Sequence, residues 1–157
     1  MFVHVLKTPL FDASGQVVGI QGIFWDVTAR IVTERALAYE RDLLRALLDS
    51  FPDRIYFKDT RSGFLRCSKS MAERLGLQDP AEIIGKTDFE FYPRELAQEF
   101  FNDEQRIIAT GVPLINKVEK LVDVDGRESW VSVTKVPIFD QDKSAKGLVG
   151  QIGRAHV

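Results

Sequence analysis

The sequence predicts an α+β chain in which a β-hairpin and a long connecting helix precede one small domain. Three observations support this fold class. The segment KTPLFD (7–12) returns as KVPIFD (135–140), and each copy begins a hairpin pattern. Residues 28–50 contain no proline or glycine and carry apolar residues at helical spacing. The remaining stretch, 51–150, reads as two strands, short helices and three further strands.

Composition places the chain among soluble globular proteins. Of its 157 residues, 45% are apolar and 28% are charged, which suits one folded domain with something added. No apolar run approaches the roughly 20 residues that cross a bilayer. Residues 1–6 are too few for a secretory signal. We therefore expect a cytoplasmic location without membrane insertion.

Charge and cysteine content exclude further classes. The net charge of −2 gives no electrostatic footprint for nucleic acid. A single cysteine, Cys67, allows no internal disulfide, and with only His4 and His156 beside it there is no metal-site spacing. We therefore expect neither a nucleic-acid partner nor a bound metal.

Residues 1–25 form the first hairpin, in which strand, proline, polar turn and second strand follow in the same order as after residue 135. Chance likeness between two ordinary hairpins is the alternative. A lone hairpin is marginally stable in water, so its apolar residues are expected to belong to a larger sheet. These residues are Phe2, Val3, Val5, Leu6, Ile20, Ile23, Phe24 and Trp25.

Residues 26–50 are expected to form the connector helix, with Thr28 as its N-terminal cap. Leu37, Leu44 and Phe51 recur at seven-residue steps, as on the seam of a coiled-coil dimer. Fewer than three heptads are present, so a helix that lies on its own domain is an equal alternative.

The remaining segment has about 100 residues, enough for one small domain. Turn residues and apolar patterns divide it into strands and helices. Asp125-Gly126 predicts the turn of the longest hairpin. The expected strands are 54–59, 64–67, 114–124, 128–139 and a last one through 147–150, and the expected helices are 68–75, 80–84 and 93–110.

Residues 46–150 resemble a PAS sensory domain. The resemblance rests on several short segments together: Phe51-Pro52-Asp53, 55–59, 84–91, Asp125-Gly126-Arg127 and 130–137. Residues 1–25 are similar to the last two strands of such a domain, and Asp26-Val27-Thr28 resembles the D-[IV]-T ending that leads into a signalling helix. The chain is thus expected to hold the tail of one PAS domain, a connector helix and nearly all of the next.

The resemblance implies a five-stranded antiparallel sheet flanked by short helices, in a bacterial sensor upstream of a histidine kinase or a cyclic-dinucleotide enzyme. No phosphate-binding glycine loop or phosphoacceptor histidine is evident in the sequence. We therefore expect a non-catalytic sensory and relay segment of a two-component type of system.

The last residues are expected to interrupt the domain. The PAS domain is assigned to 51–151 with its last strand truncated. Residues 152–157 are expected to be a non-native tail, because their back-translation matches a common short-read sequencing adapter.

Ligand chemistry in such a domain takes place in a pocket between sheet and helices. The cofactor is unknown. The segment 93–110 lacks the axial histidine that haem would need, and Cys67 closes a strand, where it cannot serve a photoactive flavin. The pocket candidates, many of which a plain core would also require, are Tyr56, Phe57, Lys58, Phe64, Met71, Phe89, Phe91, Phe100, Ile107, Glu119, Val131 and Val133.

Strand register decides the role of two lysines. Lys58 and Lys135 are expected to face solvent; if they face inward, each needs an anionic partner such as Glu119 or a carboxylate ligand. Two functions stay open: binding of a small molecule, or a ligand-free homodimer that relays signals through the connector helix. The dimer and relay candidates are Asp26, Thr28, Leu37, Leu44 and Phe51.

Overall fold

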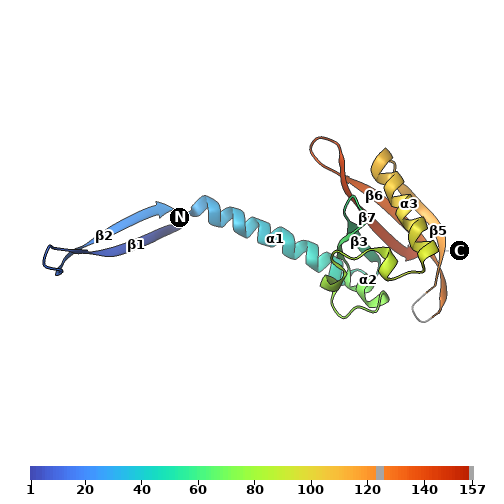
Figure 1. The fold of residues 1–157 in the computed structure, drawn as a ribbon, viewed down its shortest axis with the longest axis horizontal. Helices are drawn as coiled ribbons and strands as arrows, with labels where there is room; N and C mark the ends of the chain where they lie inside the picture. Colours follow the sequence, from blue (N-terminus) through green and yellow to red (C-terminus); the bar gives the residue numbers. More distant parts are fainter. Residues whose placement is uncertain (123–125, 156–157) are drawn as a thin grey trace. The chain divides into compact units, whose positions relative to one another are not determined.

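The computed structural model describes residues 1–122 and 126–155. The chain divides into two compact units, Met1–Arg45 and Ala46–Val157, which we describe separately (Figure 1).

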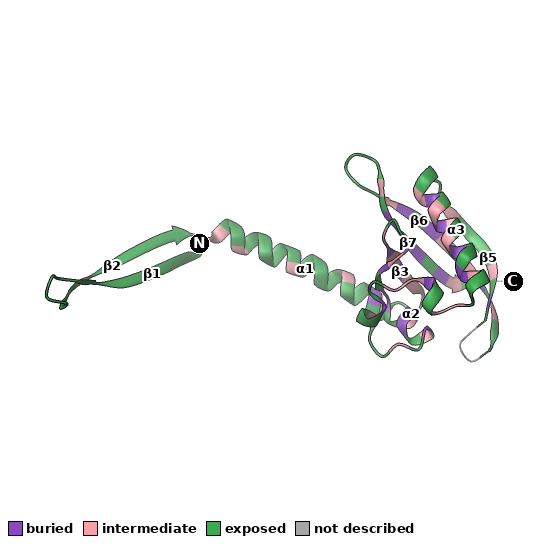
Figure 2. Cartoon of the chain, in the orientation of Figure 1, coloured by how far each residue is buried: buried purple, intermediate pink, exposed green. Residues whose placement is uncertain are grey.

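The first unit contains an antiparallel hairpin of β1 (Val3–Phe11) and β2 (Val17–Asp26), followed by helix α1 (Thr28–Ser50), whose last turn belongs to the second unit. The Asp12 carboxylate closes the turn by accepting hydrogen bonds from the amides of Ser14 at 2.8 Å and Gln16 at 3.0 Å. Nearly every hairpin residue is exposed (Figure 2). The hairpin thus has a formed backbone but no core of its own.

The start of α1 corrects one prediction. Thr28 is the first helical residue, and its hydroxyl accepts a hydrogen bond from the Phe2 amide at 2.8 Å. The carboxylate of Asp26 accepts from the Thr28 amide at 2.8 Å. Hydrogen bonds from the side chain and then the backbone of Thr28 hold the pKa of Asp26 below its ordinary value. Asp26 is therefore the side chain that caps the helix, while Thr28 ties it to β1.

The second unit is built on the predicted five-stranded antiparallel sheet, in the order β4-β3-β7-β6-β5. Consecutive strands form the hairpins β3–β4 and β5–β6–β7, and β7 returns to pair with β3 at the centre. The strands are β3 (Arg54–Lys58), β4 (Phe64–Cys67), β5 (Leu114–Val122), β6 (Glu128–Phe139) and β7 (Ala145–Arg154).

Helices lie between β4 and β5 in sequence and cover one face of this sheet (Figure 1). Ser68 caps α2 (Lys69–Arg74), and its side chain accepts a hydrogen bond from the Met71 amide. Two short 3₁₀ helices follow, η1 (Pro80–Ile83) and η2 (Asp88–Glu90). The long α3 (Arg94–Thr110) contacts β6 and β7. It ends at Gly111, whose φ of 69° favours glycine.

Alternation along the central strands decides which side chains form the core. On β6, Val131, Val133 and Lys135 are buried beneath the helices, whereas Ser132 and Thr134 face the other way. Tyr56, Phe64, Met71, Ile83 and Leu148 are among the buried residues that join them in one cluster.

Two predicted boundaries differ from the structure. β5 ends at Val122, and Asp125 of the predicted turn lies outside the described residues. β7 continues to Arg154, and Ile152 is buried and pairs with Arg54 and Val133. The strand therefore includes the first residues of the segment expected to be a non-native tail, whose origin stays a prediction. Within the described ranges, no helix is long and apolar enough to cross a membrane.

A testable consequence concerns Gly150 in β7. A Cβ at this position would overlap the Tyr56 ring on β3. We expect Gly150→Val to lower the free energy of unfolding by about 1–3 kcal/mol through overpacking, measured by urea denaturation. Gly153→Val is the matched control, because its Cβ would lie 3.7 Å from the Asp53 carboxylate, an ordinary contact. Equal losses for the two variants would contradict this account of the strand packing.

Candidate ligand-binding site

Two lysines of the sheet lie inside the second unit. Lys58 on β3 is 1% exposed and Lys135 on β6 is 3% exposed. Each shares its face with buried neighbours, Tyr56 in β3 and Val133 in β6, so strand alternation turns both lysines toward the helices. The prediction that these lysines face solvent is wrong.

Two acidic side chains from the helices meet these lysines. Glu104 on α3 is fully buried, and its Oε1 accepts from Lys58 Nζ at 2.8 Å and from Lys135 Nζ at 3.0 Å. Asp88, the first residue of η2, accepts a hydrogen bond from Lys58. We call Lys58, Asp88, Glu104 and Lys135 the buried charge cluster.

The buried charge cluster is balanced, with two cations and two anions. Burial of an unpaired charge is very unfavourable, so each member depends on its partners. Aromatic faces add to the pairing: Lys58 Nζ lies 4.3 Å from the centroid of the Phe64 ring, and Lys135 Nζ lies 5.1 Å from that of Phe100. The cluster therefore joins β3, β6, η2 and α3 through charges as well as packing.

One polar atom of the cluster lacks a protein partner. Among the buried side-chain atoms of the described residues, Glu104 Oε2 makes no hydrogen bond. Glu104 also lines a cavity of about 20 Å³, together with Tyr56, Met71, Asp88, Tyr92, Phe100, Glu119, Leu121, Val133, Lys135 and Ile152. This volume holds about one water molecule. The site thus has a free acceptor and a small, mostly apolar space beside it.

Burial changes the acidity of the groups around this cavity. It raises the pKa of Asp88, while the nearby Lys58 acts in the opposite direction. Burial, followed by the negative charges of Glu104 and Asp88, raises the pKa of Tyr56 well above its ordinary value. Burial also raises the pKa of Tyr92 to about 12. Both phenols are therefore neutral hydrogen-bond donors at physiological pH.

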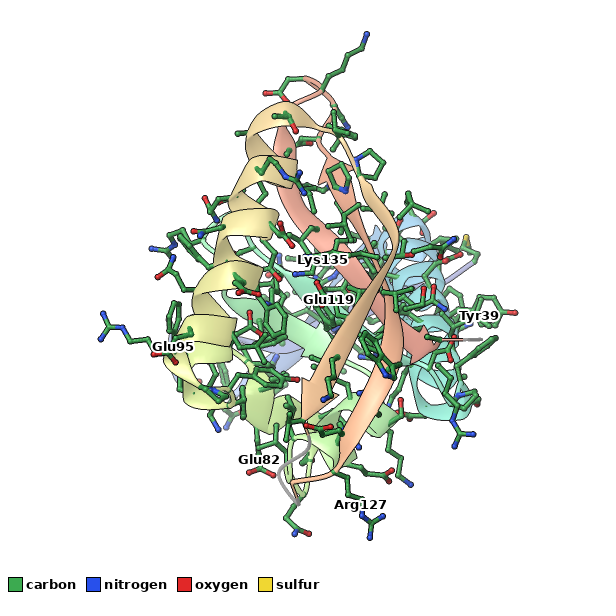
Figure 3. All side chains as sticks on the ribbon, turned by 90° about the vertical axis from the view of Figure 1, so that its right-hand side faces the viewer. Tyr39, Glu82, Glu95, Glu119, Arg127 and Lys135 are labelled. Carbon is green, nitrogen blue, oxygen red and sulfur yellow. The ribbon has the colours of Figure 1, made fainter. Side chains whose placement is uncertain are left out.

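Several predicted pocket residues come together at this cavity. Tyr56, Met71, Phe100, Glu119 and Val133 line it. Figure 3 shows Lys135 and Glu119 in the space between α3 and the sheet.

Two further candidates stack beside the cluster. The Phe64 ring lies beneath Lys58 and meets the Phe91 ring edge-on, with 6.1 Å between the ring centroids. Neither Phe64 nor Phe91 lines the cavity itself. Their contribution is therefore to the apolar wall behind Lys58.

Other candidates lie elsewhere. Ile107 and Val131 are buried in the core but do not line the cavity. Phe57 lies on the sheet face opposite to Tyr56 and Lys58, and Phe89 is 44% exposed. These four residues are therefore not cavity-lining residues.

Glu119 is not the partner of the buried lysines. Its carboxylate pairs with Lys117 at 2.7 Å, and Lys117 also contacts Asp103. Asp88 and Glu104, which sequence reasoning missed as partners, take this role. Glu104 had a detectable signal, because it lies four residues after Phe100 and three before Ile107 on the buried stripe of α3.

The described residues offer no separate metal or thiol chemistry. No group of three or more His, Cys, Asp or Glu side chains in that part of the chain is arranged to hold a metal ion. Cys67 is buried, and burial raises its pKa to about 11, so the thiol stays protonated. Cys67 therefore lies in the core as a packing residue.

A larger depression of about 1200 Å³ lies on the sheet face opposite to α3. Its lining includes Ser132, Thr134 and Gln151, which are half-buried or exposed, together with residues of α2. A ligand there would stay in contact with water. The cavity beside Glu104, which lies among buried residues, is therefore the better candidate site.

The charge cluster gives a second testable prediction. Lys58→Met removes the cation that contacts both acids, so we expect a loss of about 3–5 kcal/mol in the free energy of unfolding. Lys117→Met, at a partly exposed ion pair, should cost at most about 1 kcal/mol. Urea denaturation measures both losses.

The loss in Lys58→Met should depend on pH. Without Lys58 the folded-state pKa of Asp88, already raised by burial, rises further. An acid whose pKa is higher in the folded state than in the unfolded state makes its full contribution to stability below its unfolded-state pKa, where it is protonated. This contribution is lost as pH rises through its folded-state pKa. The loss should therefore be larger near about pH 8 than near about pH 5. A loss independent of pH would reject Asp88 as the group left uncompensated.

Comparisons with known proteins agree on the fold. The sequence model of the PAS fold matches residues 48–152. The aerobic respiration control sensor protein ArcB of Escherichia coli is 25% identical over 112 residues, which cover 71% of this chain and 14% of ArcB. The chain thus spans a small part of this relative.

Solved structures show the same architecture. VqmA bound to DPO matches with a TM-score of 0.64 and 25% identity over 70% of this chain and 55% of that one. The PAS domain of Bordetella pertussis BvgS matches with a TM-score of 0.59 and 24% identity over 77% and 89% of the two chains, a likeness that shows the fold. Because the family match covers residues 48–152 and the sheet has the expected order, this chain belongs to the PAS fold family.

Proposed function

We propose that this chain is a non-catalytic sensory and relay segment of a bacterial signalling protein, which binds a small molecule beside the buried charge cluster. The similarity to ArcB, an aerobic respiration control sensor protein, supports the sensory role. The similarity to VqmA, which was solved bound to DPO, supports ligand binding by this kind of fold.

The observation that carries ligand binding is the free acceptor of Glu104. A buried carboxylate oxygen without a donor is unfavourable, so a molecule that donates a hydrogen bond to it would stabilise the folded state. The two lysines already have anionic partners. A neutral donor therefore suits the site better than a carboxylate ligand, which the sequence offered, beside Glu119, only as a partner for inward-facing lysines.

The same cluster offers a route for relay. Lys58 lies on β3, which begins four residues after the end of α1. A ligand that donates a hydrogen bond to Oε2 of Glu104 would shift this carboxylate, and with it the hydrogen bond from Lys58 to Oε1 and the position of β3 relative to α3. α1 carries the proposed output through Leu37, Leu44 and Phe51, and Asp26 and Thr28 fix its other end to the hairpin.

A ligand-free dimerisation and relay module is the second candidate. The cavity of about 20 Å³ favours it, because most metabolites are far larger than one water molecule. Exposed apolar side chains also favour it, since Leu37 on α1 is 71% exposed and Phe51, directly after α1, is 51% exposed.

Ligand binding can be tested on the full chain by native mass spectrometry after purification from a bacterial host. We expect a small molecule that leaves on denaturation. Val133→Ile, which adds a methylene at the cavity wall, should lower the bound fraction at least about tenfold while the protein stays folded. Val136→Ile on the other sheet face is the control and should bind as the parent does.

The two functions give different outcomes in this experiment. A protein that never carries excess mass, even when it is dialysed against bacterial extract, would argue for the ligand-free module. Retention of the molecule by Val133→Ile would place the site elsewhere.

The relay helix gives a separate prediction about dimerisation. Leu44→Glu places a charge on the seam of Leu37, Leu44 and Phe51, and should weaken dimerisation of the full chain at least about tenfold. Tyr39→Glu is the control, because Tyr39 is exposed on the opposite side of α1. Sedimentation velocity measures both. An unchanged dimer in Leu44→Glu, or equal weakening by both variants, would reject the seam.

A further inference from the structure

The isolated hairpin β1–β2 has the same strand register as β6–β7. Lys7 pairs with Gly22 as Lys135 pairs with Gly150, and Pro9 pairs with Ile20 as Pro137 pairs with Leu148. Both hairpins also shift register at the residue before the phenylalanine, Phe11 or Phe139. Each residue of one hairpin therefore has a counterpart at the same place in the other.

Sequence identity between the hairpins follows one face. In β6–β7 the inward face contacts the helices and holds Val131, Val133, Lys135, Pro137, Leu148, Gly150 and Ile152, all buried. Their counterparts are Val3, Val5, Lys7, Pro9, Ile20, Gly22 and Phe24, identical in the first four and in the glycine. On the outward face, Ser132, Thr134, Val136, Val149 and Gln151 differ from their counterparts His4, Leu6, Thr8, Gln21 and Ile23, and only Gly147 is identical to its counterpart, Gly19. The shared feature is thus the face that meets a helix-covered core.

The glycines shared by the two hairpins point to a neighbouring strand beside β2. In the second unit, a Cβ at Gly147 would overlap the Lys58 carbonyl, and one at Gly150 would overlap the Tyr56 ring, so β3 requires both glycines. Their counterparts are Gly19 and Gly22. A Cβ at Gly19 would meet only the tip of Leu10 at 3.8 Å, so the hairpin itself does not require glycine there. A Cβ at Gly22 would meet the Phe24 ring of the hairpin at 3.1 Å, so Gly19 carries this argument.

The inward face of the first hairpin is also exposed where its counterpart is buried. Ile20 is 72% exposed and Phe24 is 62% exposed, whereas Leu148 and Ile152 are buried. Lys7 is exposed on the same face, in the place that Lys135 takes above Glu104. An apolar face with a lysine at its centre fits a partner that supplies apolar side chains and one carboxylate.

We propose that β1–β2 is the interaction surface for a second PAS-type core and forms the last two strands of its sheet. The partner supplies a strand equivalent to β3 along β2, with an aromatic ring over Gly22 and a carbonyl close to Gly19. It also supplies a helix whose carboxylate binds Lys7. The β3 strand of this chain is already paired with β7, so the partner is a separate PAS core.

A transplant within the full chain tests this assignment. Residues 130–152 are replaced by the sequence of residues 2–24, which has the same length and register. If the first hairpin is built for a PAS core, the chimera folds with one cooperative transition for the second unit and a Tm within about 10 °C of the parent. As a control, the same 23 residues are inserted one position out of register, which turns Lys7 and the apolar face outward, and this chimera should lose the transition.

Two further variants test the role of the lysine and keep the proposal testable if the transplanted chain does not fold. Lys135→Met should lower the Tm of the chimera as much as it lowers that of the parent; a much smaller drop would show that the transplanted lysine does not reach Glu104. The double variant Leu148→Ile, Ile152→Phe introduces only the two residues by which the inward faces of the two hairpins differ. If the transplant precipitates and this double variant also loses cooperative unfolding, or if the out-of-register control folds equally well, the proposal is wrong.

Discussion

The fold of the second unit depends on the carboxylate of Glu104. Its Oε1 binds Lys58 and Lys135, which lie on strands separated by β7. Gly150 lies on β7 between Tyr56 and Lys135, and the lack of a side chain there leaves room for the Tyr56 ring. A helix, two strands and a 3₁₀ turn therefore meet at one cluster of charges, and the small residue between the strands is part of the same arrangement.

Such a cluster is sensitive to the loss or rearrangement of any one member, because the charges of its members compensate one another. Paired charges inside a protein give little net stability compared with apolar packing, but removal of one partner is strongly unfavourable. A site of this kind responds to a new hydrogen-bond donor or acceptor by rearranging its pairs. The unpaired Oε2 of Glu104 is the place where such a rearrangement needs the least disruption. This property suits a sensor more than a rigid scaffold.

The first unit and α1 carry surfaces that a free domain would bury. The hairpin exposes an apolar face around Lys7, and Leu37 on α1 and Phe51 directly after it are exposed. The capping contacts of Asp26 and Thr28 connect these two surfaces, since they fix the first turn of α1 to the end of the hairpin. A change in a core that holds the hairpin would thus reach the start of the helix directly.

The sequence by itself determined the order of elements. Glycine and proline at turns and helix ends, alternation in the strands and the repeated KTPLFD motif indicated five strands, the helices around α3 and the two hairpins. The resemblance to PAS domains predicted the five-stranded antiparallel sheet, which the structure confirms. These signals are local, because a turn or a helix end depends on the residues within a few positions of it.

Only the tertiary structure decided the site. Alternation divides a strand into two faces but does not say which face is inside, so Lys58 and Lys135 were assigned to solvent. Their inward direction depends on Glu104, which is 46 residues from Lys58 and 31 from Lys135 in sequence. Likewise, the need for glycine at 150 exists only because β3 places Tyr56 beside β7. Pairing between distant residues forms only when the sheet and α3 come together, which is why these residues could not be assigned from local pattern.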